Sequence, residues 1–467
     1  MIRFAPTLAI IATSLAIAGT AHAAALQVTI ATGALKGVEA DHIVSFRGIP
    51  FAAPPVGPLR WRAPQPARPW KGVRDASAYA NDCMQLPFPS DAAPLGTPPA
   101  EDCLYANVWK PAGARGKLPV LVWIYGGGFV NGGSSPPTYS GAELAKKGIM
   151  VVSFNYRLGR FGTFAHPQLT KADPDHGLIG NYGYMDQLAA LNWVKRNIAA
   201  FGGDPAKVTI IGESAGGMSV HMLLTSPMAK GLFARAVIQS GGDGAGMGAT
   251  DLATVEKIGL AFAASKGIAG QDPAALEKLR ALPAQEVVDG LNLATMQRPG
   301  PRTASGPFAD GKLAVDVKAA YASGRFAPVP VMIGATSDDI GGKDGFMIKG
   351  ARDLAGALGA RGVPVFYYRF SYVADSLRGP DTRGASHASD IPYFFDTVAI
   401  KYGAATTARD RAVGTSISGY LVNFVKTGDP NGKALPSWPR FTPGGGEMMD
   451  FTADGAPAIR RDDGTGG

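Results

Sequence analysis

The chain has 467 residues, of which 46% are hydrophobic and 18% are charged, and its formal net charge is +8. Such a balance is typical of a globular protein with a large buried core, and it excludes an intrinsically disordered chain. The basic residues form no extended block, so we expect a mild attraction to anions but no nucleic acid partner.

Residues 1–23 have the pattern of a cleaved export signal. Arg3 gives a basic start, Leu8–Ala18 is an apolar run, and residues 21–23 read Ala-His-Ala, which fits a small-x-small cleavage site. The apolar run is too short to span a bilayer, and no basic stop follows it. We therefore expect a periplasmic or secreted protein without a stable membrane anchor, whose residues 24–467 form a single domain.

Cys83 and Cys103 are the only cysteines in the chain. Export would place them in an oxidising compartment, where disulfides form and persist. The alternative is a metal site, but no histidine cluster lies near the two cysteines in the sequence. The sequence therefore predicts a disulfide between Cys83 and Cys103 and no metal.

Predicted strands dominate the first third of the chain. A hairpin is expected from Val28–Ile30 and Leu35–Val38, and further strands are expected at Ala106–Lys110, Pro119–Tyr125 and Ile149–Tyr156. The last two runs are mostly apolar, which favours a sheet that is covered on both faces. A helix is predicted from Asn181 to about Ala200, because apolar residues recur there with helical spacing.

The segment Val208–Thr225 contains the most informative motif. A β-branched run leads into Gly-Glu-Ser-Ala-Gly and then into an apolar stretch of helical character. Strand, sharp turn and helix in this order form a nucleophile elbow, which needs Gly212 and Gly216 because a side chain at either position would clash across the turn. The pattern predicts that Ser214 is a nucleophile. The amide of Ala215, at the start of the helix, is expected to face a developing negative charge.

Three stretches together resemble the type-B carboxylesterase and lipase family, the cholinesterase-like branch of the α/β-hydrolases. They are Phe46–Trp61, Glu101–Trp109 and the serine elbow, and the resemblance extends from about Leu26 to about Phe451. It implies an α/β-hydrolase fold, with a central and mostly parallel sheet flanked by helices. It also implies hydrolysis of small-molecule esters through a serine, without a metal or another cofactor.

A glycine run follows the predicted strand Pro119–Tyr125. Gly126, Gly127 and Gly128 let backbone amides turn inward without obstruction. The resemblance assigns the oxyanion hole to Gly127 and Gly128, together with Ala215. This assignment agrees with the place of such a loop after an early strand of the fold.

In α/β-hydrolases the histidine follows the serine in the chain, and only His221 and His387 lie beyond Ser214. His221 is seven residues along the helix that Ser214 opens, so it should lie roughly 10 Å away, beyond the reach of a general base. The sequence therefore predicts His387, whose surroundings resemble the histidine loop of the family.

The acid is expected in the loop after the predicted strand Val329–Ala335, because catalytic groups collect at the carboxyl ends of strands in such sheets. The family pattern places the acid, which is usually Glu, at Asp339. Asp338 remains a competitor, since Asp is one methylene shorter than Glu and the register could differ by one residue. The resemblance also makes Asn181 and Asp186 buried hydrogen-bonding residues without a chemical role.

Residues 241–328 are polar and helical in pattern and resemble the lid region of the family. Only Gly341–Gly350 separates the acid loop from a helix predicted at Ala351–Arg361, and this shortness suggests an open site. A last helix is predicted at about Thr407–Lys426, and residues 455–467 are expected to be a flexible tail.

The combined prediction is a serine carboxylesterase with Ser214, His387 and Asp339 as its triad. An alternative is an esterase for bulky or anionic esters, such as toxin-like or polycarboxylate esters, motivated by the basic balance and by Arg298 and Arg302 in the lid. A lipase and a non-catalytic binding relative are further alternatives. The oligomeric state and the natural ester stay open.

Overall fold

The structure is a computed structural model. It describes residues 26–88, 93–244, 251–442, 444 and 446–462, and the expected export signal at residues 1–23 lies outside them. In this described part of the chain, no helix combines the length and the apolar character needed to cross a membrane.

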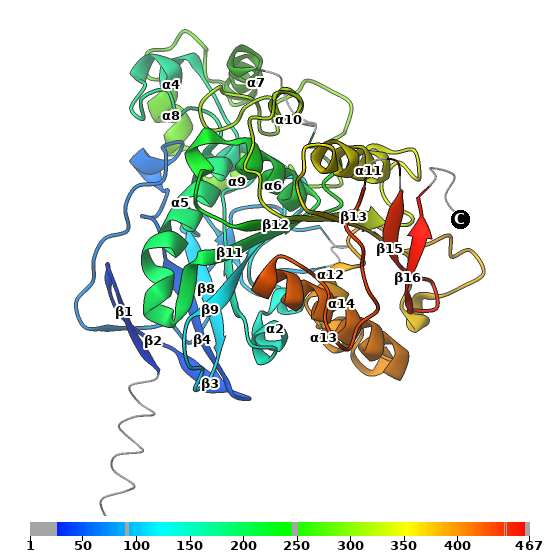
Figure 1. Ribbon diagram of the computed structural model, residues 1–467. Coiled ribbons are helices and arrows are strands. Elements are labelled where there is room, and N and C mark those ends of the chain that lie inside the picture. The colour runs from blue at the N-terminus through cyan, green and yellow to red at the C-terminus, as the bar shows by residue number, and fades with distance from the viewer. Residues whose placement is uncertain (1–25, 89–92, 245–250, 443, 445, 463–467) are drawn as a thin grey trace, which may run out of the picture.

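An 11-stranded sheet forms the centre of the molecule (Figure 1). Its strand order is β16-β15-β14-β13-β12-β11-β9-β10-β8-β4-β3. Neighbouring strands are parallel from β10 through β15 and antiparallel at both edges. The described residues thus confirm the predicted mixed α/β fold with a largely parallel sheet.

The strands of this sheet are β3 (Val38–Ala40), β4 (Ile43–Pro50), β8 (Tyr105–Pro111), β9 (Leu118–Ile124), β10 (Met150–Phe154), β11 (Gly203–Glu213), β12 (Arg235–Gln239), β13 (Val331–Thr336), β14 (Val365–Phe370), β15 (Glu447–Phe451) and β16 (Pro457–Arg461). A separate sheet contains the predicted N-terminal hairpin, β1 (Gln27–Ile30) and β2 (Gly33–Lys36), with β5 (Val73–Asp75). The short strands β6 (Asp82–Cys83) and β7 (Pro99–Ala100) pair with each other.

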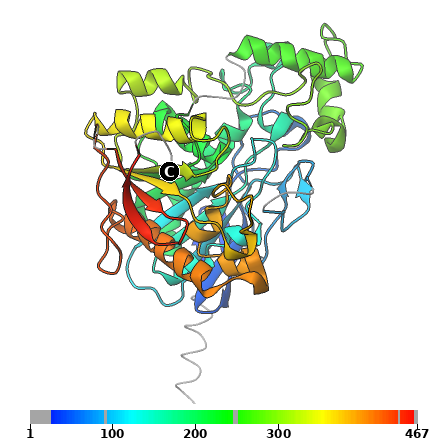
Figure 2. The same ribbon diagram turned by 90° about the vertical axis from the view of Figure 1, so that its right-hand side faces the viewer.

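Helices cover both faces of the central sheet, as Figures 1 and 2 show. Helices α5, α6 and α11 pack on one face, and α2 and α14 pack on the other. The main helices are α2 (Ala142–Lys146), α3 (Gly159–Gly162), α4 (Pro167–Ala172), α5 (Tyr182–Asn197), α6 (Ala215–Thr225), α11 (Phe346–Gly359), α12 (Ile391–Phe394), α13 (Val398–Tyr402) and α14 (Ala408–Thr427). This double cover explains why most of β9, the C-terminal half of β11 and most of β12 are buried on both faces.

The strand register brings the functional loops to one edge of the sheet. Gly212 of β11 pairs with Ile124 of β9 on one side and with Ile238 of β12 on the other. These parallel strands therefore end at the same level, and the chain after each of them emerges at the carboxyl edge, where α/β folds place their sites.

The predicted lid region contains four helices among its described residues. They are α7 (Leu252–Ser265), α8 (Ala275–Ala281), α9 (Ala284–Val288) and α10 (Val317–Ser323). Figure 1 shows them on the same side of the sheet as α6. The chain between α9 and α10 has no helix or strand, and it forms part of the pocket wall described below.

Two predicted boundaries are wrong. The flexible tail expected from residue 455 instead contains β16, which pairs antiparallel with β15, while residues 463–467 lie outside the described part. An edge strand has only one neighbour and can stay largely exposed, so β16 lacks the long apolar run that marks a central strand. Helix α11 begins at Phe346 rather than at Ala351, which shortens the connection after the acid loop.

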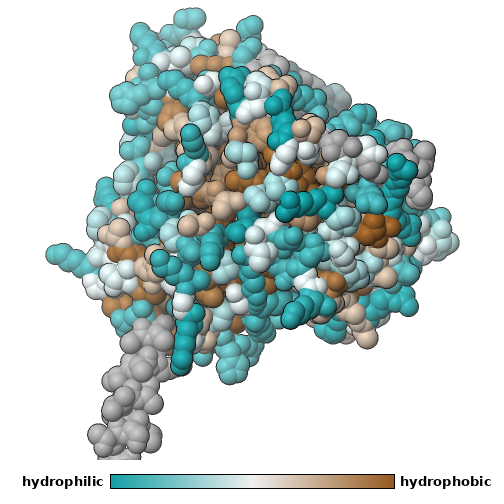
Figure 3. Space-filling model, viewed as in Figure 1, coloured by the Kyte–Doolittle hydropathy of each residue, from teal (hydrophilic) through white to brown (hydrophobic). Residues whose placement is uncertain are grey.

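The surface in Figure 3 is largely hydrophilic, with apolar side chains gathered in the upper middle of that face. The large apolar residues are mostly internal, and they include Trp123, Tyr125 and Phe366, all fully buried. The core therefore surrounds the sheet strands that carry the functional loops.

Candidate active site

Ser214 stands at a sharp turn between β11 and α6. Its backbone has φ 55° and ψ −121°, a conformation that L residues rarely adopt. A Cβ at Gly212 would lie 2.3 Å from the carbonyl oxygen of Gly216, and a Cβ at Gly216 would lie 2.0 Å from the carbonyl oxygen of Ile124. Both glycines are therefore required by sterics, as the elbow motif predicts.

Ser214, His387 and Asp339 form a continuous chain of contacts. The Oγ of Ser214 lies 3.0 Å from Nε2 of His387, and Nδ1 of His387 lies 2.6 Å from Oδ1 of Asp339. The side chain of His387 is 23% exposed, whereas that of Asp339 is fully buried. The structure thus brings together the three residues that the sequence indicated, with His387 between Ser214 and Asp339.

Asp339 has a well-defined environment. Its Oδ2 accepts a hydrogen bond from the Ser240 hydroxyl at 2.6 Å, and its Oδ1 accepts one from the Ile340 amide at 2.7 Å. Burial alone would raise the pKa of Asp339, but hydrogen bonding to His387, the positive charge of that imidazole and the Ser240 hydroxyl together lower the pKa below its ordinary value. The carboxylate is therefore held in its charged form.

Asp338 faces away from this chain of contacts. Its carboxylate lies 3.5 Å from the guanidinium of Arg383, and its backbone amide donates to the carbonyl of Ala385 at 2.9 Å. The amide of Ala385 in turn donates to the hydroxyl of Ser337. These bonds hold the loop that carries His387 against the loop that carries Asp339.

The glycine loop lies directly against the elbow. A Cβ at Gly126 would be 3.1 Å from the Cβ of Ser214. Gly127 and Gly128 have φ of 100° and 62°, values that favour glycine. Within the described residues, the amides of Gly127, Gly128 and Ala215 donate to no acceptor in the protein. These three predicted oxyanion residues therefore keep their N–H groups available.

Glu213 is a site residue that the sequence analysis missed. Its carboxylate is buried, and Oε1 lies 3.2 Å from Nε2 of His387. Burial raises the pKa of Glu213 to about 8, against the opposing charge of His387. The sequence did contain a hint of this residue, because a carboxylate stands at the end of the mostly apolar C-terminal half of β11. The Gly-x-Ser-x-Gly motif, however, allows any residue before the serine.

The imidazole of His387 is surrounded by negative charge. Burial lowers its pKa, but the Glu213 carboxylate, the hydrogen bond to Asp339 and the charges of Asp339 and Asp390 outweigh burial and raise the pKa to about 9. Asp390, also missed, is fully buried, and burial raises its pKa to about 6. The oxygen Oδ2 of Asp390 accepts hydrogen bonds from Gln239 and Tyr368, both at 3.1 Å.

His221 takes no part in this cluster, as predicted from its place on α6. Its Nδ1 lies 2.9 Å from the hydroxyl of Tyr321, and the ring is fully buried. Burial lowers the pKa of His221 to about 4, so the ring is neutral at physiological pH. His221 therefore has a structural role beneath the lid.

A cavity of about 680 Å³ extends from the glycine loop to the lid. Apolar side chains near the loop include Phe129, Met218 and Met296, and the lid segment after α9 supplies Arg298 and Arg302. The cavity is large enough for a drug-sized ligand. In the described residues, no group of three His, Cys, Asp or Glu side chains is arranged to hold a metal ion.

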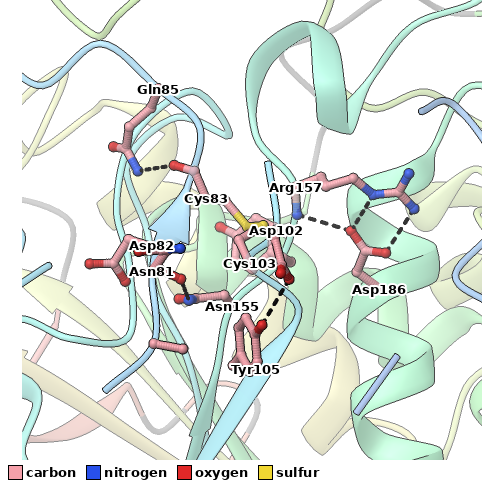
Figure 4. Close-up of a disulfide and its surroundings, with 12 residues drawn as sticks. Asn81, Asp82, Cys83, Gln85, Asp102, Cys103, Tyr105, Asn155, Arg157 and Asp186 are labelled. Carbon is pink, nitrogen blue, oxygen red and sulfur yellow. Dashed lines mark hydrogen bonds and ion pairs between the residues drawn. A yellow bond between two sulfur atoms is a disulfide. The ribbon is translucent and has the colours of Figure 1, made fainter. Parts of the chain in front are cut away.

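The predicted disulfide between Cys83 and Cys103 is present (Figure 4). Gln85, two residues after the first cysteine, donates to the carbonyl oxygens of Cys83 and Gly132, at 2.9 and 2.6 Å. Its Oε1 accepts from the amide of Gly132 and from the side chain of Asn131. The disulfide loop thereby supports the chain that follows Gly127 and Gly128.

Figure 4 also shows the ion pair between Arg157 and Asp186. The Asp186 carboxylate is fully buried and accepts from the amide, Nε and Nη2 of Arg157 at 3.0, 2.8 and 2.8 Å. Asn181 binds the backbone of Phe308 through both ends of its amide. Both residues are buried and hydrogen bonded, as the sequence analysis expected.

Comparisons with known proteins agree with this geometry. Residues 24–343 and 342–462 match the sequence profile described as Carboxylesterase family. Fumonisin B1 esterase of Sphingopyxis macrogoltabida is 36% identical over 486 residues, covering 90% of this chain and 85% of that protein. Para-nitrobenzyl esterase of Bacillus subtilis (strain 168) is 33% identical, covering 89% of this chain and 92% of that protein.

A third relative is acetylcholinesterase of Bungarus fasciatus, which is 30% identical over 90% of this chain and 82% of that protein. The match of the family profile spans nearly the whole chain, and the sheet is that of an α/β-hydrolase. The chain therefore belongs to the carboxylesterase family, and it is a carboxylic ester hydrolase.

Proposed function

We propose that this protein is a serine carboxylesterase that works through an acyl-enzyme intermediate. The observation that carries the proposal is the continuous contact from Ser214 Oγ to His387 Nε2 and from His387 Nδ1 to Asp339 Oδ1, at 3.0 and 2.6 Å. Nucleophile, base and orienting acid are thus within hydrogen-bond distance before any substrate arrives.

In the first half-reaction, Ser214 Oγ attacks the ester carbonyl while His387 Nε2 takes the hydroxyl proton. The carbonyl oxygen becomes an oxyanion, to which the amides of Gly127, Gly128 and Ala215 donate. The bond to the alcohol then breaks, and His387 returns the proton to the leaving alcohol. Removing one oxyanion donor typically costs about 2.7–4 kcal/mol of transition-state stabilisation, so the three free amides would supply a large share of the rate enhancement.

In the second half-reaction, water attacks the acyl-enzyme and gives a proton to His387. The bond between the acyl carbon and Ser214 Oγ breaks, the serine regains the proton, and the carboxylic acid is released. Asp339 stays ionised throughout and keeps the imidazole in the tautomer that accepts a proton at Nε2.

A series of para-nitrophenyl esters with rising acyl length tests this proposal and distinguishes an esterase from a lipase. Wild-type enzyme should hydrolyse short acyl esters, and Ser214→Ala should abolish turnover while the fold is retained, because the hydroxyl makes no packing contact that the fold needs. A steep fall of kcat/KM beyond short chains supports an esterase, whereas a rise with long chains in emulsion supports a lipase. Unchanged turnover by Ser214→Ala would refute the proposal.

A second candidate function within the same chemistry is hydrolysis of bulky or anionic esters. The large cavity and the arginines on its lid wall favour it.

A further inference from the structure

The lid segment that runs from the end of α9 is held in place by contacts with Arg160, Asn131 and Gly128. The guanidinium of Arg160 donates to the carbonyls of Val287 and Val288 at 3.1 and 2.6 Å, and to the carbonyl of Thr303 at 2.7 Å. Its side chain is only 4% exposed, and its charge lies 4.7 Å from the centre of the Phe262 ring. Arg160 therefore binds the backbone at both ends of the segment 287–303.

Two further contacts position the same segment. The side chain of Asn131, three residues after Gly128, accepts a hydrogen bond from the amide of Leu293 at 2.8 Å. A Cβ at Gly128 would lie 2.7 Å from Leu293 and 3.3 Å from the sulfur of Met296. The segment thus packs directly on one of the predicted oxyanion glycines, and the residues between Leu293 and Thr303 form an arc over the cavity.

That arc carries Arg298 and Arg302, both exposed and both lining the cavity. Within the described residues, neither guanidinium has an ion pair or a hydrogen-bond partner. Among the other charged groups of the cavity wall, Lys318 pairs with Asp243 at 2.8 Å, and Asp289 pairs with Lys266 at 2.8 Å. The buried guanidinium of Arg160, also on the wall, lies 3.8 Å from Asp289.

Asp316 is the remaining anion of the wall, and its carboxylate caps α10 through the Ala319 amide. The two arginines therefore leave an excess of positive charge at the lid end of a cavity whose inner end is apolar. A planar guanidinium binds a carboxylate through two parallel hydrogen bonds, which makes arginine suited to this task.

We propose that Arg298 and Arg302 bind a carboxylate on the substrate, so that the cavity selects esters that carry a negative charge away from the reacting carbonyl. This inference rests on the proposed function, because the ester itself is cleaved at Ser214. The apolar inner end would hold the chain between the ester and the carboxylate.

Two matched ester pairs test the inference and show which half of the substrate carries the charge. The first pair is para-nitrophenyl hydrogen glutarate and its neutral methyl ester, and the second is meta-carboxyphenyl butanoate and phenyl butanoate. Within at least one pair, wild-type kcat/KM should be several-fold higher for the anionic ester. This preference should shrink as salt is added, since exposed charges are screened over about 10 Å at 0.1 M salt.

Arg298→Gln and Arg302→Gln should each lower that preference about threefold to fivefold, and the double variant about tenfold, while turnover of the neutral ester is retained. Arg115→Gln is the matched control, because it removes the same charge from an exposed residue just before β9, at the opposite end of the strand from the glycine loop. It should leave the preference unchanged.

The inference is overturned if wild-type enzyme prefers both neutral esters, or if the double variant keeps the wild-type preference. An equal loss in Arg115→Gln would also overturn it, because net charge rather than the arc would then be responsible. If the enzyme hydrolyses the neutral esters but shows no preference for the anionic esters, this inference is rejected and the proposed function is not. Turnover of none of the four esters would count against the proposed function as well.

Discussion

The imidazole of His387 and the carboxylate of Asp339 lie 2.6 Å apart, between Nδ1 and Oδ1. The neighbouring carboxylate of Asp338 instead lies 3.5 Å from Arg383. Two adjacent aspartates in one loop therefore have different surroundings: Asp339 is buried against His387, and Asp338 is partly exposed.

Asp339→Asn should keep the shape of the loop but present an amide to the imidazole, which favours the wrong tautomer. We expect kcat to fall by as much as about 10⁴-fold, as in other triads. Asp338→Asn is the matched control, and its backbone bond to Ala385 is unaffected by the change, so its kcat should stay near that of wild type. Steady-state kinetics with one activated ester measure kcat of both variants. A large loss of kcat in Asp338→Asn together with a near wild-type kcat in Asp339→Asn would assign the acid to Asp338 instead.

The rise of kcat/KM with pH on the acid side of its pH profile should depend on Glu213. Its carboxylate raises the pKa of His387. In the proposed mechanism His387 must be neutral to accept the Ser214 proton, so kcat/KM should rise as pH rises through that pKa. Glu213→Gln removes the negative charge and should move the midpoint of this rise to lower pH.

The Glu277→Gln variant serves as the control for this profile, because it removes a carboxylate from an exposed position on α8. Its profile should overlay that of wild type. An unshifted midpoint in Glu213→Gln would mean that Glu213 is already protonated where His387 titrates, since its own pKa is raised by burial to about 8.

The side chain of Gln85 should matter for catalysis although it is far from the chemistry in sequence. Gln85→Ala would remove hydrogen bonds to Gly132 and Asn131 and loosen the chain that follows the proposed oxyanion glycines. Because a small misplacement of catalytic groups can cost about 10²-fold, we expect kcat to fall tenfold to a hundredfold with KM little changed. Gln65→Ala, which removes only a local bond to Ala63, should leave kcat unaltered, and equal losses in both variants would refute this role.

The ion pair between Arg157 and Asp186 should contribute to stability rather than to catalysis. Asp186→Asn would leave the buried guanidinium without its counter-charge, and breaking such a pair typically costs about 3–5 kcal/mol. Urea denaturation should show this loss in the free energy of unfolding. If the variant unfolds reversibly with wild-type stability, the pair is not the structural anchor that its burial indicates.

Much of the fold was predictable from local patterns. The strand that becomes β11 and the helix α6 are marked by a β-branched run, two glycines fixed by sterics and an apolar helical stretch, all adjacent in the sequence. Strand β16 was not predictable in this way, because residues 457–461 form a short, half-buried to exposed segment without a long apolar run, and they pair only with β15. Its existence depends on a neighbour rather than on its own composition.

In the candidate site, too, some residues were predictable from local sequence and others were not. Ser214 and His387 were indicated by a motif and by elimination, whereas the choice between Asp338 and Asp339 depends on a one-residue register that only a three-dimensional arrangement distinguishes. Glu213 and Asp390 escaped prediction because their role depends on burial next to His387, which no sequence pattern reports. The contacts that hold the lid segment through Arg160 likewise join residues more than a hundred positions apart.

The central claim is that Ser214 forms a covalent acyl-enzyme. Wild-type enzyme mixed with para-nitrophenyl acetate should be quenched in acid within the first turnover, digested and analysed by mass spectrometry. The account predicts an acetyl group on the hydroxyl of Ser214, absent from Ser214→Ala, and a burst of para-nitrophenol where deacylation is slower than acylation. An acetyl group on a different residue that is retained in a fully active Ser214→Ala variant would contradict the account.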